Sequence, residues 1–326
     1  MARRPKSMDL QDFESHIRSM VTNDLQEVEA TRLCRQPTIY HYTDVKGALA
    51  ILASRELWFT ERIHLNDTEE MTHGLRVATE ILVERAKDEI PSVADGVVSR
   101  LKDTHESRLE TFGYWSFSAS LNNDDLGQWV RYADDGRGIC LGLSFEKLRD
   151  KFAQSEIRKS LPHVHHARHF CVDYCTNRLR AKLKPYIDQA IKVLANLDIP
   201  PRDDKTWINE YSVFFYLNAG LYLHAMLHKD KEYEQEKEYR FFISGQRDAF
   251  ARYDCHCVRE RNREIVSYLK LPVPSWKGVL MHIRIGPAAP DQLRYQVSTA
   301  LNSLGIPLPE LGIDKSEIPY RNLKAD

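Results

Sequence analysis

The stretch "TIYHYTDVKGALAILASRELWFT", residues 38–60, decides how the fold begins. Residues 38–42 have the composition of a short strand, and Asp44 stands where a helix N-cap is expected. A helix through Ala48 and Leu52 should follow, and residues 57–60 should form a second strand. Within this unit, His41 and Tyr42 are either packing residues or one wall of a binding site, and this stretch alone leaves both interpretations open.

Strands and helices continue along the rest of the chain. Apolar residues at helical spacing predict helices at residues 8–35, 64–86, 179–197, 207–228 and 290–304. Strand-like runs occur at residues 113–118, 138–144, 169–174, 236–243, 265–271 and 279–285, with a helical turn at 127–137. We therefore expect an N-terminal helix over residues 1–36 and a single α+β domain over residues 37–326, with a helical insertion at about 150–228.

Composition excludes several classes of protein. With 46 basic against 47 acidic residues, the chain lacks the overall positive charge of a nucleic-acid-binding protein, and a local basic groove stays open. The basic N-terminus leads into a polar segment, so no signal peptide is expected, and no run reaches the roughly 20 apolar residues of a membrane helix. Six cysteines are sparse for this length and suit reduced thiols. We expect a cytoplasmic protein without a membrane partner.

Common cofactor and metal motifs are missing from the sequence, including GxGxxG, GxxxxGK[ST], GxSxG and HExxH. The densest group of metal-ligand residue types is HVHHARHFCVDYC, residues 163–175, and CHC at residues 255–257 could add ligands. Zinc ligands usually lie two to four residues apart in turns, whereas several of these residues lie in an expected strand. A histidine cluster with core cysteines explains the pattern equally well, and we expect no metal.

A second group of polar residues is "EYEQEKEYRFF", residues 232–242. On a strand, Glu236, Glu238 and Arg240 would share one face, while Tyr239 and Phe241 would face the other way. A solvated edge strand would explain such a charge run. The apolar residues that follow indicate instead a central strand, where buried charges need partners.

Five pieces of the sequence, taken in order, resemble the bacterial family catalogued as domain of unknown function 2971, whose members are associated with abortive-infection and other phage-defence loci. These pieces are Tyr40 to Thr43; Asn66, Asp67 and Glu70; Ser116, Ser118, Trp129, Tyr132 and Gly138; Lys229, Tyr233, Glu236, Glu238 and Arg240; and Ile285 to Pro287. The resemblance covers roughly residues 38–145 and 229–287 and leaves the helical insertion outside. Thr68 and Tyr233 stand where the family commonly has proline and tryptophan.

The opening motif is also similar to that of ADP-ribosyltransferases of the DarT and diphtheria-toxin-like groups. In those enzymes a first-strand histidine contacts the nicotinamide ribose of NAD, an aromatic side chain stacks on nicotinamide, and a late-strand glutamate serves the reaction. Cleavage of the glycosidic bond creates an oxocarbenium-like ribose, which a carboxylate stabilises by charge and hydrogen bonding. The resemblance implies an α+β fold with a split, strongly bent mixed β-sheet core and surrounding helices.

Carried onto this chain, the resemblance implies that His41 orients the ribose, that Tyr42 or Tyr132 stacks, and that Glu238 is the catalytic carboxylate. Glu236 or Arg240 would then position Glu238 or the acceptor. The residues expected to bind NAD are His41, Tyr42, Asn66, Asp67, Ser118, Trp129, Tyr132 and Arg240. Each of them taken singly also has a structural explanation, such as a helix cap at Asp67 or core packing at Trp129.

The expected function is that of an NAD-dependent ADP-ribosyltransferase-like effector, or NAD glycohydrolase, in bacterial antiphage defence. NAD would be the co-substrate, and the other partners would be a nucleic-acid or protein acceptor and either a second copy of the chain or a defence-system protein. Two alternatives stay open. One is a non-catalytic module that senses a nucleotide or a phage component. The other is a metal-dependent nuclease using Asp67, Glu70, Glu236 and Glu238, which Arg240 disfavours because it would oppose a divalent cation.

Overall fold

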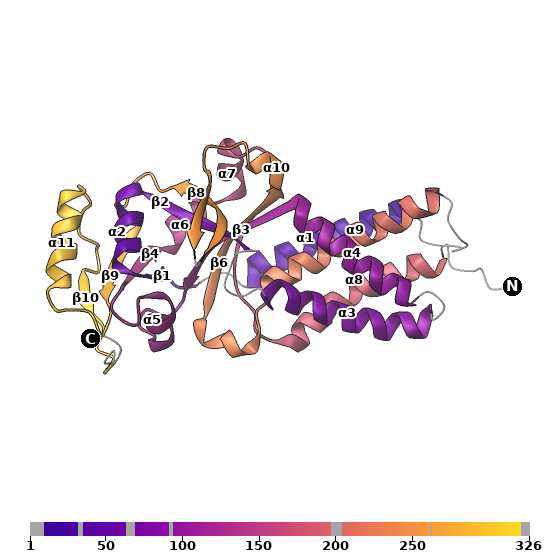
Figure 1. Ribbon diagram of the computed structural model, residues 1–326, viewed down its shortest axis with the longest axis horizontal. Helices are drawn as coiled ribbons and strands as arrows, with labels where there is room; N and C mark the ends of the chain where they lie inside the picture. Colours follow the sequence, from indigo (N-terminus) through magenta and orange to yellow (C-terminus); the bar gives the residue numbers. More distant parts are fainter. Residues whose placement is uncertain are drawn as a thin grey trace. The chain divides into compact units, whose positions relative to one another are not determined.

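The computed structural model describes residues 10–31, 35–62, 69–90, 94–196, 204–261 and 263–320, and its contacts divide the chain into two compact units (Figure 1). The helical unit consists of residues 1–32, 66–112 and 173–232. The sheet unit consists of residues 33–65, 113–172 and 233–326. The two long helices of the expected insertion thus share a unit with the N-terminal helix, while residues 150–172 of the insertion belong to the sheet unit. The expected domain boundaries themselves stay a prediction.

Long helices make up the helical unit: α1 (Leu10–Thr31), α3 (Glu69–Glu89), α4 (Ala94–Thr111), α8 (Thr176–Asn196) and α9 (Asp204–Leu227). α3 packs against α4, α8 and α9, and α1 packs against α8 and α9 (Figure 1). The core between them is aliphatic and aromatic, with Phe13, Leu82, Leu183 and Phe214 among its buried side chains. None of the helices in the described ranges is both long and apolar enough to span a membrane.

A polar network lies inside the helical unit around Asp24 of α1. Its carboxylate accepts hydrogen bonds from Tyr186 Oη at 2.7 Å and His224 Nε2 at 2.9 Å, and Lys182 Nζ lies 3.3 Å away. Burial alone would raise the pKa of Asp24, but these hydrogen bonds, from His224 and Tyr186, together with the positive charges lower that pKa to about 2. The charged form of Asp24 therefore stabilises the packing of α1 on α8 and α9.

Asp24→Asn should lower the free energy of unfolding by about 2 kcal/mol at pH 7. Because the pKa of Asp24 is depressed in the folded protein, its contribution is complete above pH 4 and is lost as the pH falls from about 4 to about 2. Urea unfolding followed by circular dichroism should show a difference between wild type and variant that shrinks over that window. Asp88→Asn, at an exposed position of α3, is the matched control, and an equal loss there would contradict this account.

The sheet unit is built on one ten-stranded mixed sheet. Its main path has the order β10-β9-β4-β1-β3-β2-β8-β7, while β6 pairs with β3 and β5. β10 runs parallel to β9, and antiparallel ladders join β1 to β4 and β2 to β8. The strands are β1 (Thr38–Thr43), β2 (Glu56–Glu61), β3 (Phe112–Ser120), β4 (Ile139–Ser144), β5 (Val164–Cys171), β6 (Glu238–Gln246), β7 (His256–Arg261), β8 (Glu264–Pro272), β9 (Leu280–Ile285) and β10 (Ile313–Lys315). The expected α+β class and mixed sheet are confirmed.

The sheet branches at β3, which pairs with three strands. β1 meets β3 through Tyr40 and Ser120, whereas β2 meets it through Thr60 and Ser116. β6 lies beside β3. At one end of this pairing the Leu121 amide donates to Lys237 O at 2.9 Å, and farther along the rings of Phe117 and Phe241 are in contact. A strand has two edges, so β6 follows one edge of β3 while β1 and β2 divide the other.

Short helices complete the sheet unit. They are α2 (Val45–Ser54), α5 (Leu126–Tyr132), α6 (Phe145–Lys151), α7 (Gln154–Ser160), α10 (Arg247–Phe250) and α11 (Leu293–Ser303), with a 3-10 helix η2 (Lys231–Glu236) before β6. Asp44 caps α2 as expected, because its carboxylate accepts from the Gly47 amide. Asp125 caps α5 in the same way through the Gln128 amide at 2.9 Å.

Two predicted strands differ from the structure. The strand expected at 236–243 begins at Glu238, because η2 continues to Glu236. Lys237 separates the two elements: its φ is 44°, and its amide donates to Glu234 O. Glu236 is therefore not on the strand face that carries Glu238. The strand expected at 169–174 is β5, which starts earlier, at Val164.

Candidate functional site

Two buried charges stand at the start of β6. The carboxylate of Glu238 is held by the guanidinium of Arg240, with Nε 2.5 Å from Oε1 and Nη2 2.8 Å from Oε2. Glu238 is 7% exposed and Arg240 is 1% exposed, so the pair is nearly withdrawn from water. As expected from their spacing, both side chains leave the same face of the strand, opposite to Tyr239 and Phe241 in the apolar core. A carboxylate of fixed orientation and negative charge results.

A second buried carboxylate lies two residues before the first in the chain. Glu236, at the end of η2, accepts hydrogen bonds from Arg131 Nη1 at 3.0 Å and from the Tyr132 hydroxyl at 2.9 Å. Both donors come from α5, and their side chains are about 40% exposed. Arg131 also lies 5.9 Å over the ring of Tyr233. Glu236 thus connects the beginning of β6 to an exposed aromatic and cationic surface on α5.

Serine side chains of β3 line the same side of the sheet. Ser120 forms a cross-strand pair with Tyr40. Ser116 and Ser118 lie on the same face of β3 as Ser120, because every second side chain of a strand points to the same face. That face is opposite to the one that carries Trp115, Phe117 and Ala119 into the core. Glu238 and Arg240 on β6 likewise lie on the face away from the core. Ser120 Oγ donates to Glu236 O at 2.7 Å. Ser116 Oγ is buried and has no hydrogen-bond partner within the described ranges.

His41 lies on the other side of the sheet. Side chains alternate between the two faces of a strand, so His41 points to the face opposite to Tyr40. This is the face of the core residues Ile39 and Phe117, and the centroid of the His41 ring is 4.9 Å from that of Phe117. Its Nδ1 lies 3.1 Å from Ser118 O, the one hydrogen-bond partner of this ring among the described residues. Burial lowers the pKa of His41. His41 therefore reaches the serine strand through the Ser118 backbone, and its expected role toward a ribose stays a prediction.

Tyr42 and Trp129 hold the segment that leads into α5. Tyr42 is buried, donates from its hydroxyl to Asn122 O at 2.9 Å and accepts from the Asp125 amide at 3.2 Å. Its ring packs edge-on against the ring of Trp129, with centroids 4.8 Å apart, and Trp129 Nε1 donates to Asp124 at 2.7 Å. Burial raises the pKa of Tyr42 well above its usual value. Of the two predicted stacking residues, Tyr42 is enclosed and Tyr132 is the exposed one.

The structure brings Glu236 together with Tyr132 and Ser120, and it pairs Glu238 with Arg240. Of the other predicted residues, Asn66 and Asp67 lie outside the described part of the chain. Arg131 was not predicted as a site residue, although it stands beside Tyr132 in the WVRY segment, because a guanidinium on a short helix gives no signal of its partner. Ser120 was not predicted either, although it lies two residues beyond Ser118 on the same strand face.

The histidine and cysteine cluster does not form a metal centre within the described ranges. No three His, Cys, Asp or Glu side chains there are close enough together to hold an ion, and Cys175, Cys255 and Cys257 are free cysteines. His169 is instead a packing residue, whose Nδ1 lies 2.7 Å from the Tyr239 hydroxyl. Burial lowers the pKa of His169 to about 4.

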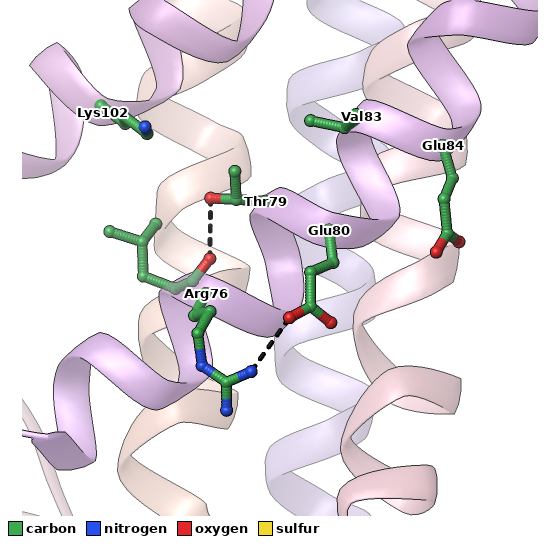
Figure 2. A pocket seen from close by; sticks show the side chains of 7 residues that line it. Arg76, Thr79, Glu80, Val83, Glu84 and Lys102 are labelled. Atoms are coloured by element: carbon green, nitrogen blue, oxygen red, sulfur yellow. Dashed lines mark hydrogen bonds and ion pairs between the residues drawn. The ribbon is translucent and has the colours of Figure 1, made fainter.

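The helical unit has a hollow of its own, of about 570 Å³, beside α3 and α4 (Figure 2). Its lining is Leu75, Arg76, Thr79, Glu80, Val83, Glu84 and Lys102. Figure 2 shows Arg76 directed at Glu80, 3.0 Å away, and Thr79 bonded back to its own helix. Glu80 and Glu84 also pair with Arg180 of α8. These charges neutralise one another, so we place the candidate chemistry at β6.

Comparison with known families adds one finding. Residues 128–241 match the model of a family described as "Protein of unknown function (DUF2971)". The matched range includes Trp129, Tyr132, Glu236, Glu238 and Arg240, so the chain is similar to the family at the site described above. It also includes α8 and most of the expected insertion, which corrects the expectation that residues 150–228 lie outside the resemblance. Comparisons with curated proteins and with solved structures gave no match.

Proposed function

We propose that the sheet unit cleaves NAD at the bond between nicotinamide and ribose and transfers ADP-ribose to an acceptor or to water. The observation that carries the proposal is that two buried carboxylates, Glu236 and Glu238, stand two residues apart where η2 leads into β6. Glu236 is bonded there to the exposed Tyr132 and, through its backbone, to Ser120 of β3. Carboxylate, aromatic wall and hydroxyl groups are what this reaction needs. The role in bacterial antiphage defence belongs to the same proposal and rests on the family resemblance.

In the proposed reaction the C1′–N1 bond breaks and its electron pair leaves with nicotinamide, which becomes neutral. The ribose becomes an oxocarbenium-like cation. Glu238, fixed by Arg240, stabilises this positive charge, while Glu236 accepts a hydrogen bond from the ribose or the acceptor. Water or an acceptor hydroxyl then forms the new bond at C1′ and releases its proton. Tyr132 contributes a flat side chain at the edge of the site.

Incubation of the full chain with NAD, alone and with cell extract, tests the proposal. Nicotinamide should accumulate with time and in proportion to the protein concentration. If acceptor transfer is the main reaction, cell extract should increase the rate. Absence of nicotinamide release under both conditions would refute the proposed cleavage.

A nucleotide-sensing module is the second candidate, and one observation favours it. Both oxygens of Glu238 are bonded to Arg240, which offsets the charge needed for catalysis. Calorimetry separates the two functions, because a sensor should bind NAD or another nucleotide tightly without releasing nicotinamide. The nuclease alternative gains no such support, since Arg131 and Arg240 already bind the two glutamates where a divalent cation would sit.

A further inference from the structure

A second hollow, of about 420 Å³, lies in the sheet unit where β5 begins and β6 ends. Its lining is Arg158 of α7, Pro162, His163, Val164, His165, His166 and Gln246. This volume is at the lower end of the range of small-molecule sites, roughly 300–1,000 Å³. The hollow shares no lining residue with the carboxylate site, and neither the proposed NAD chemistry nor a metal centre accounts for its histidines.

A β-bulge explains why consecutive histidines line one hollow. In the ladder of β5 and β6, Val164 pairs with Gly245 and His166 with Ser244, so His165 is an extra residue in β5. In a regular strand, His165 and His166 would point to opposite faces, whereas a bulge changes the direction of one side chain. The bulge is consistent with both residues, together with His163, lining the same hollow.

Side chains of α7 hold the bulge in place. Arg158 donates from Nε to Val164 O and from Nη2 to His165 O, both at 3.2 Å. Gln154 donates to His165 O at 3.1 Å. These bonds fix the guanidinium of Arg158 against the backbone of the bulge, in the lining of the hollow, and its Nη1 has no partner within the described ranges. The site is thus built by α7 and the bulge together.

The electrostatics of the lining favour an anion. Arg158 carries a permanent positive charge, three histidines offer N–H donors, and none of the described lining residues is acidic. The acidic residue of α7, Glu156, is paired with Lys159 at 2.7 Å. A guanidinium and imidazole donors match the oxygen atoms of phosphate groups. We propose that this hollow binds a small phosphate-bearing anion, of the size of pyrophosphate, between Arg158 and His163, His165 and His166.

Calorimetric titration of the full chain with inorganic pyrophosphate tests this site. The wild type should bind the probe, and two variants should bind it at least about tenfold more weakly: Arg158→Gln, and the double variant His165→Asn with His166→Asn. The double variant leaves both α7 bonds to the bulge intact, so its result does not depend on local unfolding. Arg149→Gln is the matched control, because Arg149 is an arginine of α6 outside the lining, paired with Asp150 at 2.8 Å.

Four results would overturn the proposal. The first is the absence of binding heat when pyrophosphate is added to the wild type. The second is a set of variants that bind as tightly as the wild type, and the third is a loss of affinity in Arg149→Gln equal to that in Arg158→Gln. Either of these two would indicate a diffuse positive field. Binding that requires added Zn²⁺ or Ni²⁺ would assign the histidines to a metal instead.

Discussion

The Glu238→Gln protein should release nicotinamide from NAD about 10²–10³ times more slowly than the wild type. The amide has the shape of the carboxylate but lacks the negative charge that would stabilise an oxocarbenium-like ribose. Since Glu238 is buried and held at both oxygens by Arg240, its charge acts from a fixed position. Initial rates at saturating NAD, with nicotinamide measured by chromatography, give the comparison.

Glu234→Gln is the matched control for this prediction. Glu234 belongs to η2, is about half exposed and makes a loose ion pair with Lys237 at 3.8 Å. Its loss should change the rate by less than about twofold, because an exposed ion pair contributes little. Circular dichroism of both variants shows whether the fold is retained. A folded Glu238→Gln protein with the wild-type rate would remove Glu238 from the reaction.

Arg240→Met should lower the free energy of unfolding by about 3–5 kcal/mol. Arg240 is 1% exposed, and its loss leaves the Glu238 carboxylate buried without the guanidinium that holds both of its oxygens. Removal of one partner of a buried pair is costly because the other charge remains out of water. Urea unfolding at pH 7 measures the effect.

The double variant Glu238→Leu with Arg240→Met completes the test of the pair. It should recover most of the stability lost in Arg240→Met, because no unpaired charge remains. If the single variant costs less than about 1 kcal/mol, the pair is solvated and does not fix the carboxylate. The proposed role of Arg240 as the residue that positions Glu238 would then be wrong.

Local patterns predicted much of this fold. The strand at residues 38–42, the cap at Asp44 and the helix with Ala48 and Leu52 all occur as expected, because each depends on neighbouring residues. The helix α4 was missed, since its sequence has few apolar positions in one stripe. β10 was missed as well, because a three-residue strand exists only through its pairing with β9, about thirty positions earlier in the chain.

The sequence predicted which residues belong to the site better than it predicted how they are arranged. Spacing placed Glu238 and Arg240 on one strand face, as the structure has them. The positive φ of Lys237 moved Glu236 off that strand, and no local pattern indicated it. The bonds from Arg131 and Tyr132 to Glu236 join residues more than one hundred positions apart, so they follow from the packing of α5. The side of the sheet on which His41 lies likewise depended on its pairing with β4.

The most direct test of the central claim is the time course of nicotinamide release from NAD by the wild-type chain, measured beside folded Glu238→Gln. The account predicts release by the wild type, in proportion to protein concentration, and a loss of about 10²–10³-fold in the variant. Equal rates for the two proteins, or no release by the wild type with and without cell extract, would contradict it.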